Sequence, residues 1–180
     1  MRAALIVRGT DSFGNRLIYD TDRDITWCDF TYQTSARPPE GSDKNPTWGW
    51  HEVGQWAADL TVTLGGVTYS DWRLPSAGET PSSGYNQLTP EMGHLFYVEL
   101  GNKGYEAPDG SCAQPGWGLN SKGPYQHLTA YYYWSAERYA AGQDAAWVFA
   151  FGVGFHAGFG HTDLPYFGMA VRAGDVVPEP

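Results

Sequence analysis

The stretch that decides the fold is Ala146–Arg172, which reads AWVFAFGVGFHAGFGHTDLPYFGMAVR. At its start, bulky aromatic residues alternate with small ones, which is the period-2 pattern of a strand with one buried face. The residues that this pattern turns inward are Trp147, Phe149 and Phe151. The residues that it turns outward are Val148, Ala150 and Gly152. We therefore expect a strand that buries its aromatic side and leaves its small residues at the surface.

The periodicity stops between Gly152 and Gly168, and a second short strand is expected at Met169–Arg172. Between the two strands, glycine, aromatic and polar residues follow one another without a face to bury. An irregular segment held at both ends is typical of a binding surface on a rigid scaffold. The candidate ligand-contacting residues are Val148, Ala150, Gly152, Val153, Phe155, His156, Ala157, Phe159, His161, Thr162, Asp163, Leu164 and Tyr166.

The composition excludes two classes of partner. The 180 residues carry a formal net charge of −9, whereas nucleic acids and anionic membrane surfaces require a basic footprint. We therefore predict neither as a partner. Aromatic residues make up 16% of the chain, almost as much as the 17% of charged residues, and Tyr and Trp in such numbers often serve recognition.

The two ends of the chain bear on targeting. No hydrophobic signal-peptide core follows Met1, and no run of about 18 apolar residues predicts a transmembrane helix. The closing residues 177–180, VPEP, resemble the start of a PEP-CTERM sorting tail, in which a hydrophobic helix and a basic end follow. We expect a single domain over 1–176, the start of a truncated tail at 177–180, and membrane contact only through the missing part of that tail.

Short strands, two helices and long loops are expected along the rest of the chain. Strands are predicted at 5–7, 17–19, 25–27 and 131–135, and helices at 48–61 and 89–101, the second with Thr89 as N-cap. The segments 61–64 and 67–69 either pair as a hairpin or lead out of the first helix. Loops are predicted at 31–47, 76–88 and 102–126. This pattern predicts an α+β fold with short antiparallel strands.

Two sequence features carry only weak signals for metal or redox chemistry. The segment Asp20–Asp24, DTDRD, has the spacing of a calcium loop, but an EF-hand requires Gly and Glu where this chain has Ile25 and Thr31. We expect a polar hairpin turn instead. Cys28 and Cys112 form no CxxC motif and leave two alternatives open, one disulfide in an exported protein or two buried free thiols.

The other residues that could carry chemistry are better explained by structural roles or by contact with a ligand. His156 and His161 lie near Asp163 and could bind zinc, but ligand contact or simple exposure is the preferred interpretation. Arg73 beside Trp72 is expected to be paired inside the fold. No nucleophile elbow is present in the sequence. We predict no catalytic residue, no metal site and no cofactor.

Six strings occur in a fixed order along the chain: Leu17–Thr21, Asp71–Pro75, Glu91–Phe96, Tyr133–Ser135, Ala146–Trp147 and Ala170–Asp175. Together they resemble the DUF1566, or Lcl C-terminal-like, family, especially its exported members with PEP-CTERM tails. The resemblance implies a C-type-lectin-like fold, in which the terminal strands pair, two helices flank the sheet and long loops build the ligand face. It also implies export to the cell surface or extracellular matrix.

In some proteins of this kind, an Asn-rich segment between the AW and AVR strands is diversified by a retroelement that mutates adenines. This chain departs from that pattern, because Ala146–Arg172 contains no Asn. Asn codons mutated at their adenines never encode Lys, Glu, Gln, Met or Trp, and Gly152–Gly168 contains none of these. The resemblance thus implies a non-catalytic protein whose region at about 146–168 varies to recognise an unknown protein or glycan.

Two other functions stay open. One is a lectin-like adhesin with fixed specificity for a glycan or matrix, although the Glu-Pro-Asn and Gln-Pro-Asp strings of calcium lectins are absent from the sequence. The other is a structural surface protein that assembles without a ligand. Formylglycine-generating enzymes share the fold class, but their chemistry depends on reactive cysteines, and neither cysteine here lies in such a motif. We therefore do not expect an enzyme.

Overall fold

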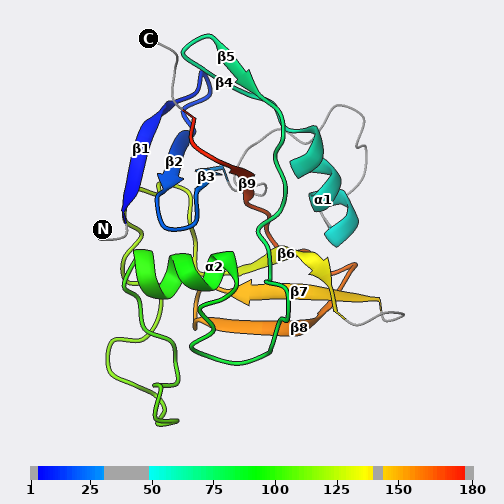
Figure 1. The fold of residues 1–180 in the computed structure, drawn as a ribbon. Coiled ribbons are helices and arrows are strands. Elements are labelled where there is room, and N and C mark those ends of the chain that lie inside the picture. The colour runs from blue at the N-terminus through cyan, green and yellow to red at the C-terminus, as the bar shows by residue number, and fades with distance from the viewer. Residues whose placement is uncertain (1–3, 31–48, 140–143, 177–180) are drawn as a thin grey trace.

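A computed structural model describes residues 4–30, 49–139 and 144–176 of the protein (Figure 1). The first antiparallel sheet has the order β1-β2-β3-β9, with β1 at Leu5–Thr10, β2 at Arg16–Asp20, β3 at Ile25–Cys28 and β9 at Ala170–Ala173. The second has the order β6-β7-β8, with β6 at Tyr132–Arg138, β7 at Ala145–Ala150 and β8 at Phe155–His161. A separate hairpin pairs β4 at Val62–Leu64 with β5 at Val67–Tyr69.

Two helical segments accompany these strands. Helix α1 spans Trp50–Asp59, and α2 spans Glu91–His94 and continues directly into a π-helical turn, η1, at Leu95–Glu99. Helices together with antiparallel sheets confirm the predicted α+β class. Within the described ranges, none of the helices has the length and apolar character needed to cross a membrane.

Strands from the two ends of the described chain lie side by side in the first sheet. β3 and β9 pair antiparallel, from Ile25 opposite Ala173 to Cys28 opposite Ala170. The terminal strands β1 and β9 thus share one sheet, but they do not pair directly as expected, since β9 pairs with the third strand, β3. The first sheet is therefore complete only when residues near both ends of the chain have come together.

The turn between β2 and β3 is formed by the acidic DTDRD segment. The Oδ1 atom of Asp20 accepts hydrogen bonds from the backbone N–H groups of Asp22 and Arg23, each at 3.1 Å. An Asp side chain that binds the backbone ahead of it stabilises a tight turn. The predicted polar hairpin turn is confirmed.

The central strands of the sheets are buried on both faces, because α1 and α2 cover opposite sides. Leu17 packs in one core cluster with Val53 of α1, whereas its neighbour Ile18 packs in the other with Met92 of α2. The same alternation runs through β3, β6, β7 and β9. Members of the α1 cluster are Cys28, Trp134, Val148 and Ala170, and members of the α2 cluster are Trp27, Tyr133, Phe149 and Val171.

The prediction that Val148 and Ala150 face outward from β7 is wrong. Val148 is buried in the α1 cluster with Trp134 and Ala157, and Ala150 is buried as well. A period-2 pattern locates the strand, but small apolar residues suit a covered second face as well as an exposed one. The aromatic residues of the pattern are buried as predicted: Trp147, Phe149 and Phe151.

Part of the segment predicted to be irregular is a regular strand. β8 pairs with β7, from Ala150 opposite Phe155 to Ala145 opposite His161. β8 contains glycines, which have no side chain and therefore interrupt the alternation of apolar and polar residues by which a strand is predicted. Only the turn at 151–154 and the stretch at 162–169 are irregular in this region.

The helices differ from their predictions in extent, and the second differs in kind. Trp48, the first residue of the predicted helix, lies outside the described residues, as do the loop at 31–47 and the tail at 177–180. Thr89 is not an N-cap, since α2 begins at Glu91 with Pro90 in the capping position. Beyond His94 the helix widens, and the Leu100 N–H donates to the Leu95 carbonyl at 2.9 Å, the five-residue spacing of a π-helix.

Arg73 is paired inside the fold, as predicted. Its guanidinium donates to both carboxylate oxygens of Glu91, each at 2.8 Å. Its backbone exchanges hydrogen bonds with Val171 of β9 at 2.8 Å. The DWRLP segment therefore ties the C-terminal strand to the start of α2.

Candidate functional site

Several residues predicted to contact a ligand are part of the core. His156 is fully buried, its Nδ1 donates to the Ser82 carbonyl at 2.9 Å, and its ring stacks on Trp147 with centroids 4.6 Å apart. Burial lowers the pKa of His156, so the ring stays neutral. The other buried candidates are Val148, Ala150, Ala157 and Thr162. His156, Val148, Ala157 and Thr162 are therefore corrected from surface to structural positions, whereas Ala150, although buried, still lines a surface hollow.

The zinc candidate of the sequence is not assembled. His161 and Asp163 are exposed and form a pair, with Nδ1 and Oδ1 2.7 Å apart. His156 is fully buried opposite Phe149 of β7, whereas His161 is exposed opposite Ala145, four residues or about 13 Å further along that strand. The two histidines therefore cannot bind one ion.

The remaining candidates lie at or near the surface. Gly152 and Val153 belong to the turn between β7 and β8, and Phe155 opens β8. Leu164 and Tyr166 pack at the edge of the α1 cluster. Phe159 lies on β8, but its side chain falls outside the described part of the structure.

Aromatic side chains from four parts of the chain gather next to this turn. We call this group the aromatic surface, and its members are Tyr85, Tyr105, Trp117, Tyr131, Tyr132, Phe155 and Tyr166. Three of them are well exposed: Trp117 at 41%, Tyr131 at 40% and Tyr132 at 37%. The other four are half-buried. Large rings with one face in the protein and one in water are typical of recognition surfaces.

The rings form two connected rows. In the first, Tyr85 contacts Phe155 at 4.8 Å and Tyr105 at 6.2 Å between centroids, and Tyr105 contacts Trp117 at 5.3 Å. In the second, Tyr132 stacks on Tyr166 at 5.0 Å. Such contacts hold each ring in a fixed orientation, which lowers the entropy lost when a ligand binds.

An open hollow of about 300 Å³ separates the two rows. It is lined by Tyr85 and Phe155 from the first row, by Tyr132 from the second, and by Ala150 and Val153. Its walls are mostly apolar, with two phenol rings as the polar groups. A hollow of this kind accepts a flat, partly apolar group and can hydrogen-bond its edge.

The turn between β7 and β8 forms one wall of the hollow, and residues from another part of the chain hydrogen-bond to its backbone. The Tyr97 hydroxyl donates to the Gly154 carbonyl at 2.5 Å, and the Tyr105 N–H donates to the Val153 carbonyl at 2.8 Å. Both partners lie in or just after η1. The long segment that follows η1 therefore positions the hollow, in line with the expectation that long loops build the ligand face.

Most of the aromatic surface was missed by the sequence analysis, which assigned the site to 146–168. Tyr85, Tyr105 and Trp117 come from irregular segments, Tyr131 directly precedes β6, and Tyr132 is the first residue of β6. The available signal was the run of three tyrosines at 131–133, since consecutive residues of a strand cannot all face the core. Only Tyr133 of this run is buried.

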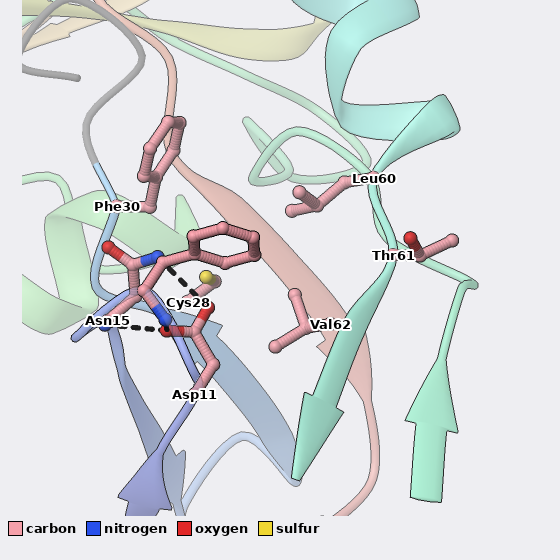
Figure 2. A pocket seen from close by; sticks show the side chains of 8 residues that line it. Asp11, Asn15, Cys28, Phe30, Leu60, Thr61 and Val62 are labelled. Carbon is pink, nitrogen blue, oxygen red and sulfur yellow. Dashed lines mark hydrogen bonds between the residues drawn. The ribbon is translucent and has the colours of Figure 1, made fainter. Parts of the chain in front are cut away.

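A second hollow of about 230 Å³ lies between the β1–β2 turn and the start of β4 (Figure 2). Asp11 stabilises this turn, because its Oδ1 accepts hydrogen bonds from the backbone N–H groups of Phe13 and Asn15 at 2.9 and 2.8 Å. The Cys28 thiol lies at the base of the hollow, and burial raises its pKa far above the ordinary value. A thiol held in its protonated form is a poor nucleophile.

The cysteines correspond to neither alternative of the sequence analysis. Both are free, Cys28 is buried and Cys112 is exposed. They therefore form no disulfide with each other, and only one of them is shielded from solvent.

One side-chain cluster among the described residues has the composition of a metal site. It consists of Asp20, His94 and Glu99, each of which offers one ligand atom within 4.8 Å of the others. It lies between β2 and the helical segment α2–η1. No metal site was predicted from the sequence, in which Asp20 is more than 70 positions from His94 and Glu99.

Comparison with protein-family models, curated proteins and solved structures finds no match to this chain. The function must therefore be argued from the geometry of the site.

Proposed function

We propose that this protein is a non-catalytic binding protein that takes a glycan or an extracellular protein on its aromatic surface. The observation that carries the proposal is the convergence of rings from separate segments around an open hollow, with Trp117, Tyr131 and Tyr132 still exposed. Burying an aromatic side chain on binding contributes more than burying any other type, and interface hot spots are enriched in Tyr and Trp.

The absence of catalysis in this proposal is supported by the state of the cysteines. Burial keeps the Cys28 thiol protonated, whereas Cys112 is exposed. Thiol chemistry needs a thiolate, which a neighbouring base or cation must stabilise.

A C-type-lectin-like fold and export to the cell surface belong to the same proposal. The fold assignment is supported by the β3–β9 pairing, by the two helices on opposite faces and by the long segment between η1 and β6. A recognition surface rich in exposed rings suits a protein that meets its ligand outside the cell.

Diversification by a retroelement, as the resemblance implies, is proposed only for the accessible part of 146–168. A scaffold tolerates variation where side chains do not fill the core, since core substitutions typically cost a few kcal/mol. The accessible positions among those described are Gly152, Val153, Phe155, His161, Asp163, Leu164 and Tyr166. A template repeat near the gene that differs from this segment mainly at adenines is the expected finding.

Fixed specificity is the second candidate function, and one observation favours it. Five of the seven rings of the aromatic surface lie outside 146–168: Tyr85, Tyr105, Trp117, Tyr131 and Tyr132. When most of the rings that contact the ligand lie outside the variable region, changes within 146–168 leave much of the ligand preference unaltered. Differences from any template repeat spread equally over all four bases would favour this candidate over diversification.

Binding arrays test the proposal. We expect the labelled protein to bind members of a glycan array or an array of extracellular proteins, and Tyr132→Ala and Trp117→Ala each to weaken binding at least tenfold. Hot-spot rings typically contribute more than 1.4 kcal/mol, which corresponds to that factor. The control is Phe13→Ala, which removes an exposed ring from the distant β1–β2 turn.

Two outcomes would contradict the proposal. Binding that survives both ring substitutions but is lost in Phe13→Ala would move the site to another face. No binding to either array, together with light scattering that grows with protein concentration, would instead favour the structural surface protein. Each ring substitution should lower the melting temperature by only a few degrees, since an aromatic pair contributes about 0.5–1.5 kcal/mol.

A further inference from the structure

The cluster of Asp20, His94 and Glu99 is packed more tightly than three solvated side chains would be. His94 Nε2 lies 3.4 Å from Glu99 Oε1 and 3.7 Å from the Oδ2 of Asp22, which stands beside the cluster. One ligand atom of each cluster residue lies within 4.8 Å of the other two. Atoms bound to one ion at about 2.0–2.2 Å lie roughly 3–4.5 Å from one another. The spacing therefore suits a shared ion after small adjustments.

Burial makes this arrangement costly when nothing is bound. Asp20 is 0% exposed and the Glu99 side chain is 2% exposed. Within the described residues, Asp20 Oδ2, His94 Nε2 and Glu99 Oε1 have no hydrogen-bond partner. A buried polar atom without a partner is destabilising, and a buried carboxylate more so. Three such atoms that meet at one point indicate a missing group that binds all of them.

The local backbone holds the three side chains in position. The other oxygen of Asp20 is fixed by the N–H groups of Asp22 and Arg23, which leaves Oδ2 free to face the cluster. In an α-helix, residues five apart are separated by about 140° around the axis. The π-helical turn reduces this separation, and so His94 and Glu99 reach the same point. Turns of this kind occur frequently at functional sites.

The charges of the cluster also favour a cation. The carboxylates of Asp20 and Glu99 meet at the cluster with one imidazole, and the carboxylate of Asp22 lies 3.7 Å from His94 Nε2. Metal ions bind the neutral imidazole and the ionised carboxylate, and a bound cation stabilises both forms.

We propose that Asp20, His94 and Glu99 bind one divalent transition-metal ion, of the Zn²⁺ or Mn²⁺ class, that joins β2 to the α2–η1 segment. One imidazole nitrogen and two carboxylates form a mixed donor set that such ions accept, whereas Mg²⁺ and Ca²⁺ prefer oxygen donors alone. The ion is structural, because it connects two elements of the core. This inference does not depend on the ligand of the aromatic surface.

Metal titration of the chelator-treated, tag-free protein tests the proposal. A Cys112→Ser background removes the exposed thiol, which could bind zinc by itself. We expect calorimetry with ZnCl₂ or MnCl₂ to show one ion per chain, and MgCl₂ to show no comparable binding. At 100 times the Kd, the melting temperature should rise by about 5–10 °C.

Two variants locate the ion. Glu99→Gln keeps the shape of the side chain and should weaken binding at least tenfold, while the metal-free melting temperature stays equal or rises, because a buried charge is removed. His94→Gln is the second ligand variant and should weaken binding to a similar extent. The matched control is His161→Gln with Asp163→Asn, which removes an exposed pair of the same residue types.

Three results would overturn the proposal. The first is wild-type protein that binds neither Zn²⁺ nor Mn²⁺. The second is binding that is unchanged in both ligand variants. The third is binding that is lost in the control at the exposed pair, which would place the ion on the surface.

Discussion

At the scale of single residues, two arginine–carboxylate pairs of similar geometry differ in burial. Arg73 donates to both oxygens of Glu91, and Arg172 donates to both oxygens of Asp71. The Glu91 side chain is 12% exposed, whereas that of Asp71 is 60% exposed. Glu91 also accepts the Ser76 N–H at 2.7 Å. The arginines differ in the opposite direction, with Arg73 42% and Arg172 15% exposed. Because it is the Glu91 carboxylate that is buried, loss of its charge should destabilise the protein more than loss of the charge of Asp71.

We predict that Glu91→Gln lowers the free energy of unfolding by about 1.5–3 kcal/mol, because hydrogen bonds to charged groups are lost at a buried position. Asp71→Asn, the matched change at the exposed carboxylate, should cost less than about 1 kcal/mol. Urea unfolding of both variants measures the difference. Equal effects would show that burial of the carboxylate does not govern this pair.

His156 provides a prediction on pH. Its pKa is lowered in the folded state by burial, so below the ordinary value of 6.5 the unfolded chain takes up a proton that the folded chain does not. Stability should therefore fall as the pH drops below about 6.5, by at most about 1.4 kcal/mol per pH unit from this residue.

Replacing the ring with a neutral side chain tests this effect. His156→Gln can still donate to the Ser82 carbonyl, and it should make stability depend less on pH below about 6.5 than in the wild type. Urea unfolding at several pH values from 7.5 to 5 provides the measurement, with the exposed His161→Gln as control. A pH dependence that is the same in His156→Gln and wild type would rule out a buried neutral ring.

At the scale of elements, β7 shows what a period-2 pattern can and cannot predict. The alternation located the strand and the burial of Trp147 and Phe149 correctly. It could not show that Val148 is covered as well, because the covering residues, among them Val53 of α1, are distant in sequence. Tertiary packing decides whether a strand of alternating large and small residues has a solvent face.

The second helix shows a similar limit. The sequence correctly predicted a helix within 89–101, and the structure buries Met92, Leu95 and Phe96 of this helix together. Glu99 is a charged residue at the end of the same apolar segment. The π-helical turn, which brings Glu99 to His94, depends on packing that no periodicity reveals. A buried acidic residue within an apolar face was the available signal for the metal cluster.

The turn between β7 and β8 gives a prediction at this scale. Gly154 has φ of +75°, and an added Cβ would lie 2.6 Å from the Tyr97 hydroxyl and 2.7 Å from Phe96 Cε1. Gly174 has φ of +73° but open space around it. Both Gly→Ala changes add the strain of a left-handed conformation, about 1–2 kcal/mol, but only Gly154→Ala also overpacks its surroundings.

We therefore expect Gly154→Ala to destabilise the protein by about 1–3 kcal/mol more than Gly174→Ala. Thermal and urea unfolding of the two variants provide the comparison. The ring of Tyr97 would be displaced in Gly154→Ala, so the wall of the hollow should also be disturbed. Equal destabilisation by the two changes would mean that the turn is not packed as described.

At the scale of the whole molecule, the sequence predicted the elements better than it predicted their assembly. The strands at both chain ends, both helices and the acidic turn follow from local patterns. The aromatic surface does not, because it joins irregular segments that carry Tyr85 and Trp117 to the ends of β6 and β8. Loop positions are determined by long-range contacts such as the hydrogen bond from Tyr97 to Gly154.

The central claim is that the aromatic surface binds the ligand, and hydroxyl-radical footprinting tests it most directly. With the tightest-binding array member present, oxidation of Trp117, Tyr131 and Tyr132 should fall severalfold, while that of Phe13 on the distant β1–β2 turn should stay the same. Protection of Phe13 with unchanged oxidation of the three rings would contradict the account.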